Sequence, residues 1–444
     1  MVCIITYARS WQALIAVRAL GKAGIKVITA DTDKYATSFF SRYSKGNFLY
    51  TSPDVDEKKF VQDLIKRCKQ YRKKYKEDVM ILPIHKETYI ISKYKDKLSR
   101  YAKLCVEDHK KIMRVHNKSA LPDILKKHNI THPRTFKIRD TTELYKLTPK
   151  LKFPVFLKLP EAASAVGLVK VDERDRLIYE YNRLIKRYHL KPKNFPIIQE
   201  GVKGKDYCVT AILNKGKLRA MMTYISIRTY PHKAGASAYR KNVSIPAMDK
   251  QAKKLLSKIK WHGPIEIDFR MGPDKIPYLI EVNPRFWGGL NQSVASNVNY
   301  PMLAYNIAVN GDCETVKKIN KDVRTENLPM ALMSLMEEIK QNKAKQKEIA
   351  KLRNYWKKAF SGRKDFSKYM NLFFKHFVKM KKKRYTRRTI EEFIYRRKRI
   401  AKDDILDSKD PFAVFGILYP IHLMLKHGKI DTAMLTGEMS EKKK

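Results

Sequence analysis

The sequence is poor in cysteine and contains no long apolar run. Its 444 residues include five scattered cysteines, Cys3, Cys68, Cys105, Cys208 and Cys313. They form no CxxC pair and no metal-ligand spacing, so we expect small, reduced core thiols and a cytoplasmic protein. No apolar run approaches the about 20 residues that span a bilayer. The apolar start at residues 1–5 lacks the basic lead of a signal peptide.

Acidic residues are also scarce. The chain has 94 Lys and Arg against 44 Asp and Glu, which gives a net charge of +50. The excess is spread over residues 1–313 as well as 314–444. A dispersed excess is typical of a solvated basic surface with a general attraction to polyanions, and a dedicated nucleic-acid face would concentrate it. We therefore do not expect a nucleic-acid partner.

The first hundred residues lack a dinucleotide fingerprint but have a strand–helix–strand pattern. Strands are expected at 2–5 and 27–30, around a helix at 11–23, and this order favours a parallel sheet. The loop Thr6–Ser10 has no glycine, so NAD and FAD are not predicted. A helix at 57–74 and strands at 79–82 and 104–106 complete a small α/β domain that ends near Asp108.

Residues 263–285 carry the most informative pattern. They predict two strands joined by a Gly-Pro-Asp turn. The strand period of two places Glu266 and Asp268 on one face of the first strand, and Glu281 and Asn283 on one face of the second. With the turn between them, Asp268 lies opposite Glu281 and Glu266 opposite Asn283. Three carboxylates and an amide would then share one patch.

Like charges that face each other across a sheet repel, so this patch favours a bound cation. Mg²⁺ prefers carboxylate and carbonyl oxygens and accepts phosphate oxygens as further ligands. Arg285 follows directly and is suited to hold a phosphate oxygen. The alternative is an amphipathic hairpin with a solvated acidic face.

Two lysines upstream suggest contacts to an anion. Lys118 precedes a predicted short helix, and Lys158 lies in the apolar strand 153–160. A buried lysine requires a partner, and the loop of small residues at 161–167 could cradle phosphates. The alternative for Lys158 is a surface lysine whose stem packs on apolar neighbours.

The order and spacing of these motifs make the chain resemble the ATP-grasp superfamily. Within that superfamily it is most similar to the carboxylate–amine ligases of the D-aspartate-ligase and biotin-carboxylase-related branch. The residues that carry the resemblance are Lys118, Lys158, Gln199–Val202, Asp206, Asp268 and Glu281–Arg285. It covers roughly residues 1–312. It implies an α/β chain with a Rossmann-like domain at 1–108 and an ATP-grasp domain at 109–312. The lid of that domain lies roughly at 140–200, its other part is an antiparallel sheet, and a helical basic extension follows at 313–444.

The resemblance also implies roles for these residues. ATP phosphates would contact Lys118 and Lys158, the adenine would contact the backbone of Glu200 and Val202, and the ribose would contact Asp206. Mg²⁺, with Mn²⁺ as an alternative, would be held by Asp268, Glu281 and Asn283. Arg285 and Lys158 would be catalytic. Two departures stand out: the lid loop is not Gly-rich, and Asp206 replaces the Glu of many relatives.

The implied activity is ATP-dependent joining of a small-molecule carboxylate and an amine through an acyl phosphate. Arg228, His232 and Arg240 lie in a predicted loop at 228–240 and would hold the substrate carboxylate; the alternative is an ordinary basic loop. Two other functions stay open: carboxylation through carboxyphosphate, and nucleic-acid binding on an inactive scaffold. Relatives of this kind are often homodimers.

Residues 313–444 contain no family motif. Helices are expected at 328–336 and 337–358, followed by a basic cluster at 379–399 and an apolar run at 411–425 that Pro420 interrupts. Basic and apolar segments together suit peripheral contact with an anionic membrane. The alternative is a helical extension that buries the apolar run against the core.

Overall fold

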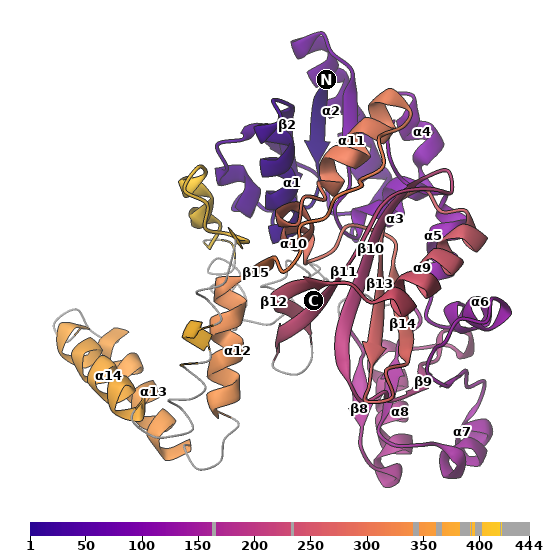
Figure 1. Cartoon of the computed structure of the whole chain (residues 1–444), viewed down its shortest axis with the longest axis vertical. Helices are drawn as coiled ribbons and strands as arrows, with labels where there is room; N and C mark the ends of the chain where they lie inside the picture. The colour runs from indigo at the N-terminus through magenta and orange to yellow at the C-terminus, as the bar shows by residue number, and fades with distance from the viewer. Residues whose placement is uncertain are drawn as a thin grey trace.

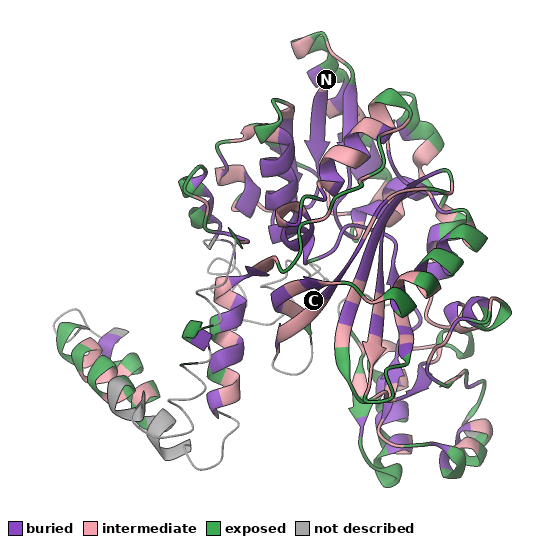
Figure 2. Cartoon of the chain, in the orientation of Figure 1, coloured by how far each residue is buried: buried purple, intermediate pink, exposed green. Residues whose placement is uncertain are grey.

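The computed structural model describes residues 1–161, 166–231, 235–340, 346–360, 366–381, 391, 393–395, 402–417 and 419. These residues form a five-stranded sheet, a four-stranded sheet and a seven-stranded sheet. The chain begins in the domain at the top of Figure 1, and the four-stranded sheet lies at the bottom. The strands of the two larger sheets are mostly buried (Figure 2).

The N-terminal sheet is parallel, as predicted, with the strand order β3-β2-β1-β4-β5. Its strands are β1 (Val2–Ile5), β2 (Lys26–Asp31), β3 (Ser44–Leu49), β4 (Val79–Leu82) and β5 (Lys103–Leu104). Its helices are α1 (Trp11–Lys22), α2 (Glu57–Tyr75), α3 (Glu87–Lys93) and α4 (Lys95–Ser99). The strand order reverses direction between β1 and β4. At such a switch point the carboxyl ends of the strands leave a crevice for side chains and ligands.

Three strands of the four-stranded sheet lie in the range 140–200 predicted for the lid, β6 lies just before that range, and the sheet has its own core. Its order is β6-β9-β7-β8. The strands are β6 (Thr135–Phe136), β7 (Val155–Lys158), β8 (Val169–Val171) and β9 (Ile197–Glu200), covered by α7 (Thr141–Leu147) and α8 (Arg174–Tyr188). Leu157, Leu177 and Tyr181 are among the residues that fill this core. Helices α5 (His109–His116) and α6 (Leu121–Lys127) connect it to the N-terminal domain.

The seven-stranded sheet carries the acidic hairpin. Its order is β14-β13-β10-β11-β12-β15-β16. The strands are β10 (Lys205–Asn214), β11 (Lys217–Tyr230), β12 (Ala236–Val243), β13 (Gly263–Met271), β14 (Pro277–Asn283), β15 (Arg324–Glu326) and β16 (Lys402–Asp403). The helices packed around it are α9 (Pro246–Ile259), α10 (Leu290–Ala295) and α11 (Tyr300–Asn310). The predicted register is confirmed: Glu266 pairs with Asn283 and Asp268 with Glu281.

The prediction of a loop at 228–240 is wrong. Residue Arg228 lies in β11 and Arg240 in β12, and the two strands pair with Thr229 opposite Ser237. The β-branched residues before Tyr230 continue the strand, and the turn chemistry of Pro231 and Gly235 is confined to a short connection.

The C-terminal region packs on the body through the helix at 328–340, which contacts β11 and β12, and through an irregular segment that begins at Lys402. Helix α12 (Leu328–Lys340) continues across position 336, where a break between two helices was predicted. Helices α13 (Gln346–Phe360) and α14 (Phe366–Lys381) pack against each other, at a distance from the sheets (Figure 1). Strand β16 pairs in parallel with β15, and the short 3₁₀ helix at Pro411–Ile417 contacts the one at Thr37–Phe40. The start of the apolar run is therefore docked, while residues 382–390 and 420–425 lie outside the described residues. None of the helices in the described part of the chain has the length and apolar character needed to cross a membrane.

Candidate active site

An amide lies at the centre of the acidic patch. Asn283 Nδ2 is 3.0 Å from Asp268 Oδ2, 3.4 Å from Glu266 Oε2 and 3.4 Å from Glu281 Oε1. Tyr224 of β11, which lies one strand beyond β10, donates a 2.9 Å hydrogen bond to Glu266 Oε1. The structure thus brings the three predicted metal ligands together and adds Glu266, which the strand period had placed beside them.

The charges of the patch are unbalanced. Burial, together with Glu266 and Glu281, raises the pKa of Asp268 well above its usual value. Burial also raises the pKa of Glu281, but Lys118 and Lys158 outweigh it and lower that pKa to about 2. The pKa of Asp268 stays raised although Lys158 also interacts with this carboxylate, and a bound cation would relieve its repulsion from the other carboxylates.

The donor set fits a divalent cation. Ligand atoms of Cys208, Glu266 and Asp268 lie within 4.8 Å of one another, and Cys208 Sγ is 3.1 Å from Asp268 Oδ1. Oxygen donors dominate and suit Mg²⁺, while the thiol is a softer ligand. The Asn283 amide hydrogens now take the position nearest the carboxylates. Rotation of that amide by half a turn would offer Oδ1 instead.

Three cationic side chains face the same patch from three different elements. Lys118, which follows α5, has its Nζ 3.7 Å from Glu281 Oε2. Lys158 ends β7 and donates a 2.8 Å hydrogen bond to Gln199 Oε1; burial lowers its pKa to about 8. Arg285 follows β14 and donates to Asn283 Oδ1 at 3.4 Å. A polyphosphate beside the acidic patch would be in reach of all three charges.

A small cavity lies beside these lysines. Its lining includes Lys118, Leu121, Leu125, Lys158, Gln199 and Leu279. Apolar walls with a few charged groups at one end are usual for small-molecule sites.

The predicted adenine and ribose contacts lie at the edge of the same region. The Glu200 carboxylate is engaged within the protein, since its Oε1 accepts from Lys152 N at 3.0 Å and lies 3.1 Å from Arg134. Asp206 pairs with Arg270 at 2.9 Å, and Val202 is partly buried. These geometries leave the backbone role of Glu200 and Val202, and the ribose role of Asp206, as predictions.

Two of the three predicted substrate residues, Arg228 and Arg240, form ion pairs within the protein. Arg240 is fully buried and forms a two-pronged ion pair with Asp404 at 2.6 and 2.7 Å. Arg228 pairs with Glu338 at 2.7 Å. His232 lies outside the described residues. Their contact with a substrate stays a prediction, and Arg240 would have to release Asp404 to make one.

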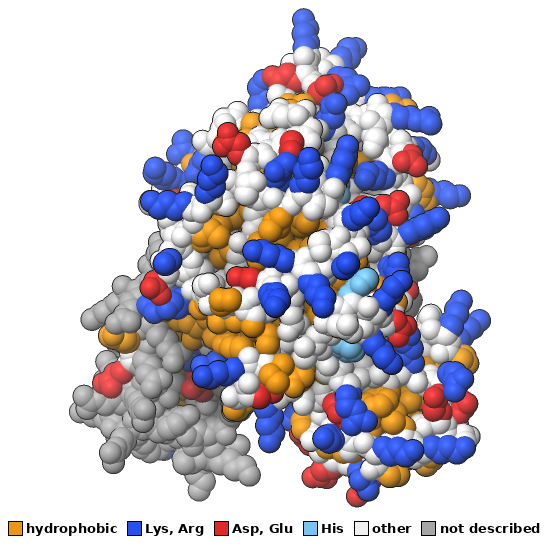
Figure 3. All heavy atoms as spheres, turned by 45° about the vertical axis from the view of Figure 1, so that its right-hand side comes forward, with side chains coloured by type: hydrophobic (Ala, Val, Ile, Leu, Met, Phe, Trp, Pro, Cys, Tyr) orange, Lys and Arg blue, Asp and Glu red, His pale blue; other side chains and the backbone are white. Residues whose placement is uncertain are grey.

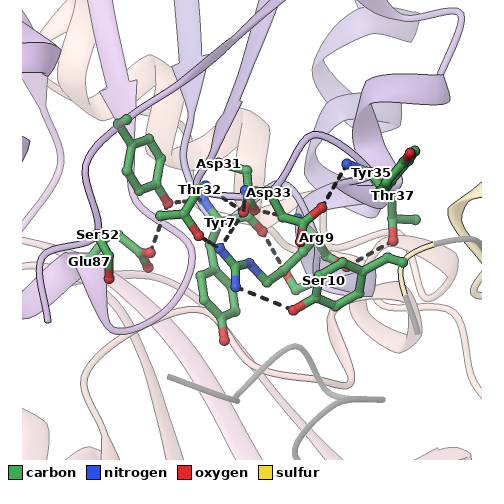
Figure 4. A network of polar contacts seen from close by, with 12 residues as sticks. Tyr7, Arg9, Ser10, Asp31, Thr32, Asp33, Tyr35, Thr37, Ser52 and Glu87 are labelled. Carbon is green, nitrogen blue, oxygen red and sulfur yellow. Dashed lines mark hydrogen bonds and ion pairs between the residues drawn. The ribbon is translucent and has the colours of Figure 1, made fainter. Parts of the chain in front are cut away.

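Sequence reasoning missed a second polar cluster, at the switch point of the parallel sheet (Figure 4). Arg9 forms an ion pair with Asp31, and the Tyr50 hydroxyl donates a 2.9 Å hydrogen bond to Glu87. Glu87 Oε2 and Thr6 Oγ1 are buried with no hydrogen-bond partner among the described residues. The one available signal was Asp31 directly after a strand.

The parallel sheet, the four-stranded sheet and the antiparallel sheet with its acidic hairpin together have the ATP-grasp fold. Residues 196–331 match the family model "ATP-grasp in the biosynthetic pathway with Ter operon". A curated relative, the alpha-aminoadipate–LysW ligase LysX of Saccharolobus solfataricus, is 33% identical over 97 residues. That match covers 22% of this chain and 35% of the relative, so the chain spans about a third of the length of the curated relative it matches.

Solved structures share the fold at low sequence identity. A biotin carboxylase from Campylobacter jejuni, solved as a β-γ-ATP complex, has a TM-score of 0.58 and 14% identity, over 72% of this chain and 74% of that one. An L-amino acid ligase from Bacillus licheniformis has a TM-score of 0.55 and 14% identity, over 70% and 75%. These likenesses establish the α/β ATP-grasp fold that the sequence predicts.

Proposed function

We propose that this chain is an ATP-dependent, ADP-forming carboxylate–amine ligase that makes an amide bond through an acyl phosphate. The observation that carries the proposal is the convergence of three carboxylates and three cationic side chains beside one cavity. The ligase relatives support the same chemistry, since the curated relative and one of the solved structures are named as ligases.

A carboxylate reacts slowly with an amine because its oxygen is a poor leaving group. Transfer of the ATP γ-phosphoryl group to it gives an acyl phosphate, and the amine then displaces phosphate. Mg²⁺ held by Asp268, Glu281 and Asn283 would supply charge neutralisation at the phosphate oxygens. Lys118, Lys158 and Arg285 would bind the phosphates and offset the charge that develops during transfer.

The test is a screen of amino acids and carboxylates, bicarbonate included, for release of ADP and phosphate by the purified chain. Glu281→Gln keeps the shape of the side chain and removes its charge, so substrate-dependent ADP release should fall by a factor of about 100 or more. The matched control is Asp274→Asn in the exposed turn of the same hairpin, which should retain wild-type turnover.

Full activity in Glu281→Gln would reject the site. Release of ADP with bicarbonate but with no pair of carboxylate and amine would favour carboxylation instead of amide formation.

A further inference from the structure

Two stacked rings lie between Arg285 and the end of strand β7. Tyr89 is in α3, and His116 is the last residue of α5. Their ring centroids are 4.5 Å apart with an interplanar angle of 29°. His116 is buried, and both of its ring nitrogens have hydrogen-bond partners. The pair therefore links the N-terminal domain to the phosphate end of the candidate active site.

The hydrogen bonds of this pair have a defined direction. His116 Nε2 lies 3.3 Å from the Glu161 carbonyl oxygen, which can only accept, so Nε2 carries the hydrogen. Burial and the nearby Lys118 and Arg285 lower the pKa of His116 to about 4, so its ring is neutral and Nδ1 accepts.

It follows that the Tyr89 hydroxyl donates to His116 Nδ1 across 3.3 Å. Burial raises the pKa of the Tyr89 hydroxyl, and the interaction with the Arg285 guanidinium counters that rise. A chain of polar contacts thus runs from Arg285 through Tyr89 and His116 to Glu161.

Two more bonds fasten the same turn to the end of β7. The backbone N of Lys118 donates to the Pro160 carbonyl oxygen at 2.8 Å, and Asn117 Nδ2 donates to Glu161 Oε1 at 3.1 Å. The turn that carries Lys118 is therefore fixed against the strand that carries Lys158. The chain of polar contacts adds Arg285, the third cation, which follows the end of β14.

We propose that Tyr89 and His116 are positioning residues that hold Arg285, Lys118 and Lys158 in one arrangement around the transferred phosphoryl group. The proposal rests on the ligase function proposed above. The physical reason is that three like charges from separate elements repel one another before the nucleotide binds. Displacement of a phosphate-binding group by about 1 Å can cost up to about 100-fold in rate.

Tyr89→Phe tests this because it keeps the stacked ring and removes only the hydroxyl. We expect kcat for substrate-dependent ADP release to fall about tenfold while KM for ATP changes less than about threefold. His116→Ala should behave like Tyr89→Phe. His116→Gln retains one donor and one acceptor and should recover most of the rate. Tyr94→Phe, just beyond α3, is the matched control and should be unaffected. Wild-type kcat in Tyr89→Phe, or equal losses in His116→Gln and His116→Ala, would overturn the proposal.

Hydrogen exchange of the Lys118 amide separates this proposal from the ligase function, since it requires no turnover. That amide bonds to Pro160, and it should exchange faster in Tyr89→Phe and His116→Ala than in the wild type or Tyr94→Phe. If the wild type releases no ADP with any substrate, the ligase function fails, while faster exchange would still support the positioning role. If the wild type is active and the variants match it in kcat and exchange, the positioning role fails alone.

Discussion

At the scale of single residues, the site is defined by carboxylates whose negative charge is only partly compensated by nearby cationic side chains. Asn283 reaches three carboxylates with one neutral NH₂ group. Lys118 and Lys158 compensate Glu281, whereas Asp268 keeps a raised pKa beside Glu266. A bound cation would complete the balance, and this explains why so many acidic groups are tolerated at a mostly buried position.

Glu87, in the cluster of Figure 4, should make the stability of the folded protein depend on pH. Burial raises its pKa to about 7. In the unfolded chain a Glu titrates near about 4.3, so between these values the folded state holds the extra proton and stability falls as pH rises. Glu87→Gln keeps an oxygen for the Tyr50 hydroxyl and removes the charge. At pH 8 it should be more stable than the wild type by up to about 3 kcal/mol; at pH 4 the difference should vanish.

Urea unfolding at both pH values checks this expectation. Glu173→Gln, at an exposed position before α8, is the control and should be neutral at both. An equal effect of Glu87→Gln at pH 4 and pH 8 would show that the residue does not titrate as described.

The residues that could be predicted are those whose neighbours are close in sequence. Asp268, Glu281 and Asn283 follow from a strand period of two and a short turn, and the hairpin register confirms their grouping. Cys208 could not be found in this way because it lies 60 residues from Asp268, on the strand that pairs with β13. The pairing of Arg240 with Asp404, 164 residues away, was equally invisible.

At the scale of elements, the segment from Lys402 to Ile417 is the main surprise. It begins with a two-residue strand, continues as turns and ends in a short 3₁₀ helix, so it has no extended periodicity that a sequence pattern could reveal. Its acidic residues hold it in place: Asp404 pairs with Arg240 of the antiparallel sheet, and Asp410 pairs with Arg18 of α1. The segment thus ties the N-terminal domain to the sheet that carries the site.

Asp410→Ala should destabilise the protein strongly. The Arg18–Asp410 pair is buried, with side-chain exposures of 5% and 0%, and Asp410 Oδ1 also accepts from Arg42 N at 2.8 Å. Removing one partner leaves an uncompensated buried charge, which costs about 3–5 kcal/mol. The control is Asp407→Ala in the same segment. Its partner Lys22 is 39% exposed, so the cost should stay below about 1 kcal/mol.

Chemical denaturation of both variants beside the wild type measures the difference. Equal stability of Asp410→Ala and Asp407→Ala would mean that the segment does not lock the two domains together.

At the scale of the whole molecule, the candidate site is a meeting point of three layers. The antiparallel sheet supplies the acidic hairpin, the four-stranded sheet supplies Lys158, and α3 of the parallel domain supplies Tyr89 next to Arg285. Lys and Arg side chains are scattered over the face shown in Figure 3, in agreement with the dispersed charge of the sequence. A net charge of +50 favours the approach of an anionic nucleotide without specifying where it binds.

Calorimetric titration with ATP decides whether this meeting point is a Mg-nucleotide site. The wild type should bind ATP in the presence of Mg²⁺ and lose most of that affinity in EDTA. The double variant Asp268→Asn with Glu281→Gln should show no Mg²⁺ dependence, whereas Asp274→Asn should bind as the wild type does. Mg²⁺-dependent binding of equal strength in the double variant would contradict the assignment of the acidic hairpin.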